Sequence, residues 1–122
     1  MSRAAHTRYD ERTPYVTKDG SSVRELMHPT HDGCRKQSLA EAIVAPGAAT
    51  ALHRHRETEE LYHVVAGHGL MTLGEAAFAV GVGDTICIPP GTPHYIVNTR
   101  ECELCILCCC APAYDDRDTE LL

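Results

Sequence analysis

The sequence predicts an all-β, single-domain protein in which short strands form a sandwich or a barrel. Its 122 residues are the usual size of one domain. Runs of β-forming residues alternate with Gly and Pro at intervals of about 6 to 12 residues. No hydrophobic pattern with a helical period reaches a comparable length. These three observations leave little room for a helical or mixed architecture.

The N-terminal third begins with a polar arm and continues with three candidate strands. Residues 1–14 are rich in Arg, Asp and Glu, and we expect them to be a mobile arm. Strands are expected at 15–17, which ends at the turn Lys18-Asp19-Gly20, and at 23–27, which is closed by Pro29. A longer strand is expected at 37–45, where the residues alternate in character before the Pro46-Gly47 turn.

The remaining strands are short and closely spaced. A charged loop at 56–59 and tight turns at 74–75 and 89–93 separate the strand candidates, which are 50–55, 60–66, 70–73, 76–80, 85–88, 95–98 and 103–109. The predicted barrel therefore covers residues 15–112. Residues 113–122 are assigned to an acidic C-terminal tail with a short helical turn near 115–120.

Composition limits the class of partner and the compartment. The formal charge is −6 and no cluster of Lys and Arg stands out, so nucleic acid is not an expected partner. The chain shows neither the apolar run of a signal peptide nor the roughly 18 apolar residues of a membrane span. We therefore expect a cytoplasmic protein that does not bind membranes.

The seven cysteines are interpreted as reduced thiols. Their number is odd and no export signal precedes them, which argues against a disulfide framework. The C-x-x-C spacings at 102–105 and 105–108 lie in an apolar run without the turn residues that a zinc knuckle needs. In a strand, Cys108 and Cys110 face opposite to Cys109, so the three cannot bind one ion together. The role of the Cys108–Cys110 run is left open.

Four residues are candidates for a mononuclear metal site. His53 and His55 are two positions apart, so in a strand both imidazoles face the same side and can reach one ion. Glu60 and His94 would supply the other two donors. Such a set suits Fe, Mn, Ni, Cu, Co or Zn rather than Ca or Mg, which prefer shells of oxygen.

The spacing around these residues resembles the cupin superfamily. Its two motifs, G-x5-H-x-H-x4-E-x6-G and G-x5-P-x-G-x2-H-x3-N, are matched at every fixed position by Gly47, His53, His55, Glu60, Gly67, Gly83, Pro89, Gly91, His94 and Asn98. The distance to Gly67 selects Glu60 over Glu59 as the acidic ligand. The resemblance implies a cupin barrel, that is, a double-stranded β-helix or jelly roll. It also implies one divalent transition metal per chain, with iron the expected ion.

Several functions are compatible with this centre. Four protein donors around an octahedral ion leave two positions for substrate, water or O2. We expect an oxygenase-type oxidoreductase that acts on a small organic molecule. A non-catalytic module that binds metal and a small ligand, and a metal-dependent isomerase or lyase, stay open as alternatives. The apolar residues expected to face inward offer no cation for a phosphosugar.

Other polar residues near the motifs receive weaker assignments. His63 is three residues after Glu60, so it should face away from the site, whereas Tyr62 shares the face of Glu60. His28 and His31 lie in a loop that could cover the mouth of the barrel, and their role, like that of Tyr62, is left open.

We also expect a homodimer. The outer strand candidates at 15–17 and 23–27 precede the motif region, and an unpaired edge strand favours pairing with a second chain. Small cupins of the kind that this chain resembles commonly form dimers in this way.

Overall fold

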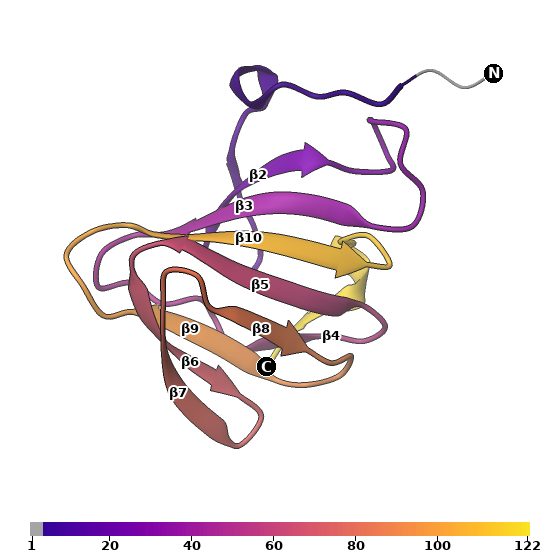
Figure 1. Cartoon of the computed structure of the whole chain (residues 1–122). Coiled ribbons are helices and arrows are strands. Elements are labelled where there is room, and N and C mark those ends of the chain that lie inside the picture. The colour runs from indigo at the N-terminus through magenta and orange to yellow at the C-terminus, as the bar shows by residue number, and fades with distance from the viewer. Residues whose placement is uncertain (1–3) are drawn as a thin grey trace.

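The computed structural model describes residues 4–122, which form two antiparallel β-sheets facing each other (Figure 1). One sheet contains, in spatial order, β1 (Tyr15–Val16), β2 (Ser22–Met27), β3 (Ser38–Val44), β10 (Leu104–Ala111), β5 (Glu59–Ala66) and β8 (Thr85–Ile88). The other contains β11 (Thr119–Leu121), β4 (His53–His55), β9 (His94–Asn98), β6 (His68–Leu73) and β7 (Ala76–Gly81). The prediction of an all-β fold is confirmed.

The core lies between the two sheets and follows the alternation of the strands. Along β10, Leu104, Ile106, Cys108 and Cys110 are buried while the residues between them are partly exposed. The neighbouring strand β3 turns Ser38, Ala40, Ala42 and Val44 inward. Packed sheets lie about 10 Å apart, a gap that alanine side chains do not fill. The small residues of β3 therefore leave room for a cavity beside the polar residues of β4.

The strand that carries the first two histidines is shorter than the sequence predicts. A strand was expected over 50–55, but β4 begins at His53. The hydroxyl of Thr50 accepts a hydrogen bond from the backbone N–H of Ile96 at 3.0 Å, and Ala48 accepts one from the N–H of Asn98 at 2.8 Å. Residues 48–50 are thus joined to β9 by irregular hydrogen bonds, and regular strand pairing begins only at β4.

The C-terminal residues are more structured than the predicted tail. After the 3₁₀ helix Asp116–Asp118, β11 pairs antiparallel with β4, and Thr119 lies directly opposite His55. This strand could not be predicted from the sequence, because residues 119–121 are too few to show a pattern. The last residues of the chain therefore lie beside the strand that carries two of the predicted ligands.

The N-terminal arm lies partly outside the described residues, which begin at position 4. From there on it includes the 3₁₀ helix Tyr9–Glu11 and contacts the first sheet. The hydroxyl of Tyr9 donates to the carboxylate of Glu41 at 2.6 Å, and Arg12 forms an ion pair with Asp32. Its mobility stays a prediction, but its docking position is on β2 and β3. In residues 4–122 no helix is long and apolar enough to cross a membrane.

Candidate metal centre

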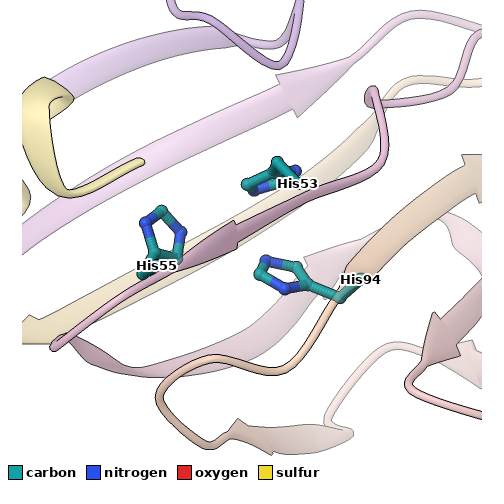
Figure 2. Close-up of side chains that lie close together, drawn as sticks. All are labelled: His53, His55 and His94. Atoms are coloured by element: carbon teal, nitrogen blue, oxygen red, sulfur yellow. The ribbon is translucent and has the colours of Figure 1, made fainter. Parts of the chain in front are cut away.

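Three of the four predicted ligands come together between the sheets (Figure 2). His53 and His55 project from the same face of β4, and His94 is the first residue of the neighbouring strand β9, directly opposite His53. All three side chains are buried. Each offers a ring nitrogen that lies within 4.8 Å of the other two. This separation is short enough for a single ion to reach all three.

Backbone carbonyls fix the protonation of two of these rings. Nδ1 of His53 lies 2.7 Å from the carbonyl oxygen of Ala51, and Nδ1 of His94 lies 2.9 Å from that of Thr92. A carbonyl oxygen can only accept, so in each ring the proton must be on Nδ1. Nε2 of a neutral ring is then left with a lone pair, which is the form that binds a metal.

The third ring is fixed in the same way by the C-terminal segment. Nδ1 of His55 lies 3.0 Å from the hydroxyl of Thr119. That hydroxyl donates its own hydrogen to the carbonyl of Asp115 at 3.1 Å, so toward His55 it acts as the acceptor. The proton of His55 is therefore on Nδ1, and its Nε2 also carries a lone pair into the site.

The three lone pairs face one another without a donor between them. Nε2 of His94 is buried and has no hydrogen-bond partner in the described chain. Burial, and after it the repulsion from His53 when that ring carries a second proton, lowers the pKa of His94 to about 4. The ring is therefore neutral at physiological pH. A cluster of buried acceptors is unfavourable by itself and becomes favourable around a cation. These residues fit a transition metal ion.

Glu60 reaches the same place from the opposite sheet. Its Oε1 lies 3.1 Å from Nε2 of His55 and 3.9 Å from Nε2 of His94, but it accepts no hydrogen bond in the described chain. Its Oε2 accepts a hydrogen bond from the thiol of Cys110 at 3.3 Å. Burial, together with the carboxylate of Glu60, raises the pKa of that thiol, which keeps it protonated as a donor. Glu60 lies at one side of the histidine cluster, with one oxygen free.

Residues 40–110 match the cupin domain family. The chain belongs to the cupin family. It is 54% identical over 116 residues to the uncharacterized protein MJ1618 of Methanocaldococcus jannaschii, an alignment that covers 95% of this chain and 93% of that protein.

Solved structures support the cupin fold. The nucleoside dehydratase Pac13 of Streptomyces superimposes with a TM-score of 0.79 at 19% identity, over 98% of this chain and 92% of its own. The polyketide cyclase RemF of Streptomyces resistomycificus superimposes with a TM-score of 0.75 at 26% identity, over 91% and 79% of the two chains. The predicted jelly-roll barrel is confirmed.

Two glycines of this cupin show why the motif spacing is strict. Gly67 has a φ of +86°, and a Cβ there would lie 2.6 Å from the carbonyl oxygen of Glu103. Gly91 has a φ of +78°, and its N–H donates to the carbonyl of His55 at 2.7 Å. Both positions favour glycine. The second one ties the turn before His94 to the strand that carries His55.

The other residues singled out from the sequence lie outside the cluster. Asn98 donates to the carbonyls of Val44 and Cys102, at 3.0 and 2.8 Å, and so links strand ends as a structural residue. His63 is exposed and is hydrogen-bonded to Thr85, as expected for a residue that faces away from the site.

The loop histidines and Tyr62 take different positions around the barrel. His28 and His31 line a second, more open pocket, and Nε2 of His28 lies 2.8 Å from the carbonyl of Tyr114. Tyr62 is buried, with its ring centroid 6.1 Å from that of His94. It therefore belongs to the wall of the metal centre, whereas the two histidines lie near the C-terminal segment.

A cavity opens beside the cluster, and two carboxylates that the sequence analysis missed, Asp19 and Glu25, line it. Its lining includes His53, His55, Glu60 and Asp19, and none of the lining residues is Lys or Arg. Asp19 belongs to the turn between β1 and β2, where the sequence analysis predicted only a turn. Burial opposes the ionisation of Asp19, but hydrogen bonds from Ser21 and Thr17 outweigh it and lower the pKa of the carboxyl group.

Proposed function

We propose that this cupin is a metal-dependent enzyme whose single divalent transition metal ion is held by His53, His55, Glu60 and His94. The observation that carries the proposal is the set of three Nε2 lone pairs, each fixed by a hydrogen bond on Nδ1, beside a carboxylate oxygen without a partner. Such fixed rings are typical of metal ligands rather than of histidines that serve only packing.

The donor set limits the ion and its chemistry. Three imidazoles and a carboxylate suit Fe, Mn, Co, Ni, Cu or Zn, with iron the expected ion. An ion bound there would serve as a Lewis acid or a redox centre for a molecule at its remaining positions. The protein supplies fixed ligands, a largely apolar wall and the exclusion of bulk water.

The lining of the cavity indicates the class of substrate. Ala40, Ala42, Val44, Ile96 and Ile106 form much of it, without Lys or Arg. A phosphorylated substrate would leave its charge without a cation here, which costs free energy. We therefore propose a small, mostly apolar organic substrate that binds through one or two oxygen atoms. With iron at the centre, oxygenase chemistry on such a molecule is the reaction that we favour.

A reaction without O2 is the second candidate. It is favoured by the 26% identity to the polyketide cyclase RemF over most of both chains. In that case the ion would polarise an oxygen atom of the substrate for cyclisation or elimination, and no redox change would occur. A module that binds metal and a ligand without turnover is the remaining alternative.

Metal analysis and activity assays separate these cases. The protein purified without added metal is assayed for bound ions, and His55→Ala and His94→Ala should lose most of the ion because each removes one donor. His63→Ala and Glu59→Gln are matched controls, since both side chains are exposed. Unchanged metal content in both ligand variants would refute the centre.

The reaction class needs a second measurement. O2 consumption is followed with 1,3-diketones, catechols and thiols as substrates for the metal-loaded protein. Consumption that depends on His94 supports the oxygenase. Turnover that is equal with and without O2 assigns the protein to the second class, and binding without turnover assigns it to a ligand-binding module.

A further inference from the structure

We propose that Asp19 is a fifth protein ligand of the metal ion, through its Oδ2. The inference rests on the metal centre proposed above and changes its composition from one carboxylate to two. Asp19 lies outside both cupin motifs, in the turn that joins β1 to β2. Its carboxylate enters the cavity from the side of His53, whereas Glu60 enters beside His55.

The two oxygens of Asp19 have different surroundings. Oδ1 accepts three hydrogen bonds: from the hydroxyl of Thr17 at 2.8 Å, and from the N–H and the hydroxyl of Ser21 at 2.9 and 2.6 Å. In the described chain no hydrogen bond reaches Oδ2, whose polar neighbour is Nε2 of His53 at 3.6 Å. The turn therefore needs only Oδ1, and it aims Oδ2 at the histidine cluster.

A hydrogen bond between the two side chains does not explain this approach. When His53 carries a single proton, that proton is on Nδ1, which donates to the carbonyl of Ala51. Nε2 of His53 and Oδ2 of Asp19 are then two acceptors facing each other. Nε2 of His55 and Oε1 of Glu60 form the same arrangement at 3.1 Å. One cation between the rings and the carboxylates would satisfy both pairs.

The distance fits a shared ion. Two donors, each about 2.1 Å from an ion, lie about 3.0 Å apart at right angles and about 3.4 Å apart at the tetrahedral angle. Around a six-coordinate ion the spacing of about 3.0 Å applies, so the 3.6 Å between Oδ2 of Asp19 and Nε2 of His53 has to close by about 0.6 Å. In the described chain only the three histidine nitrogens lie within 4.8 Å of one another, so Oδ2 has to approach the cluster when the ion binds. By the same measure the pair of His55 and Glu60, at 3.1 Å, is already at the spacing of adjacent ligands.

The turn is attached firmly enough to place a ligand. The carbonyl of Asp19 accepts a hydrogen bond from the N–H of Ala51 at 2.8 Å, two residues before His53. On the other side, Nζ of Lys18 donates to the carbonyls of Asp116 and Thr119, at 2.7 and 2.9 Å. These bonds connect the turn both to the segment that leads into β4 and to β11.

A fifth ligand has a direct consequence for the reaction. Around a six-coordinate ion, three imidazoles and two carboxylates leave one position for an exchangeable molecule instead of two. Two carboxylates also balance the charge of a divalent ion in a largely apolar cavity. We therefore expect one water molecule on the ion in the resting protein.

The test compares Asp19→Asn with wild type by metal affinity and by the number of bound water molecules. Asparagine keeps an oxygen at Oδ1 for the turn and removes the anionic donor at Oδ2. Affinities for Mn²⁺, Co²⁺ and Zn²⁺ are measured by competition with a chelator, and bound water by proton relaxation of the Mn²⁺ form. We expect the affinity to fall at least about 10–100-fold and the relaxation from bound water to rise about twofold.

Two further variants separate ligation from support of the turn. Asp84→Asn alters a carboxylate in another turn, where it accepts a hydrogen bond from the N–H of Gly81 and does not line the cavity, so it should change neither quantity. Ser21→Ala weakens the hydrogen bonding at Oδ1 but keeps Oδ2, so it should retain most of the affinity and the single water.

The outcomes distinguish this inference from the centre itself. If wild type binds metal and Asp19→Asn binds it equally well with the same water count, the fifth ligand is refuted while the four-ligand centre stands. If Ser21→Ala lowers affinity as much as Asp19→Asn and neither changes the water count, Asp19 acts only through the turn and the inference fails. If none of the three ions binds wild type, the proposed function fails as well.

Discussion

The hydrogen bond between Thr119 and His55 provides a sensitive test of the centre. The hydroxyl of Thr119 is buried and connects Nδ1 of His55 to the carbonyl of Asp115. Thr119→Val keeps the shape of the side chain and removes the acceptor. The ring of His55 is then free to rotate or to shift its proton to Nε2. Loss of such a supporting partner typically lowers metal affinity about 10–100-fold, or about 1.4–2.7 kcal/mol.

The same substitution should also lower the stability of the metal-free protein. In the variant, the Nδ1–H of His55 is buried without an acceptor, which costs about 1–3 kcal/mol. Urea unfolding of the apoprotein measures this term, and competition with a chromophoric chelator measures the affinity. Thr119→Ser, which restores the hydroxyl, should recover most of both.

The chain offers a matched control for this experiment. Thr85 and His63 form the same type of hydrogen bond at 2.8 Å on the exposed face of the other sheet. Thr85→Val should leave metal affinity unchanged. If Thr119→Val binds metal as tightly as wild type, or if Thr85→Val weakens binding equally, the reasoning that the C-terminal strand orients a ligand is wrong.

Three further predictions concern the whole chain. His94 has a pKa of about 6.5 in the unfolded chain and of about 4 in the folded apoprotein. The free energy of unfolding of the apoprotein, measured in urea, should therefore fall as the pH decreases from about 6.5 to 4, and a constant value would contradict this. All seven cysteines should react with a thiol reagent after denaturation without reduction, and in the native protein exposed Cys87 and Cys102 should react before buried Cys108 and Cys110; a shortfall of two or more thiols would indicate a bridge or a second metal site. We propose a homodimer through the edge strand β1, so light scattering should give about twice the 13.3 kDa of one chain, and a single-chain mass at micromolar concentration would refute it.

Local patterns explain why much of the site could be predicted. Alternation along a strand is enough to place His53 and His55 on one side and to separate His63 from Glu60. The spacing of glycine and proline sets where the turns lie, so that the start of β9 falls at His94. These features depend on neighbours within a few residues, and the structure reproduces them.

Contacts between distant segments explain what the sequence missed. Asp19 lies in a short turn, and Thr119 lies in a three-residue strand near the C-terminus. Neither segment has a hydrophobic period. Thr119 reaches the site because β11 pairs with β4, and Asp19 reaches it because its carbonyl accepts a hydrogen bond from the N–H of Ala51, just before β4. Lys18-Asp19-Gly20 is predicted as the turn that ends the strand 15–17, which agrees with its backbone, but this prediction says nothing of where Oδ2 of Asp19 lies.

The cost in stability of the polar groups buried in the core indicates the same site. Four buried side-chain atoms of the described chain have no hydrogen-bond partner, and each such atom costs about 1–3 kcal/mol. Oε1 of Glu60 and Nε2 of His94 lie at the histidine cluster, Oε2 of Glu25 belongs to a residue that lines the cavity, and Nε of Arg24 is on β2. Around them, β3 contributes Ala40 and Ala42 where larger side chains would pack better against the opposite sheet. A fold that only needed stability would fill this space and avoid the orphaned atoms. The orphaned atoms of Glu60 and His94 lie beside the space that the alanines leave, which is expected where a protein keeps a site ready for a ligand. A cation would remove the first cost, and a small substrate would fill the space that causes the second.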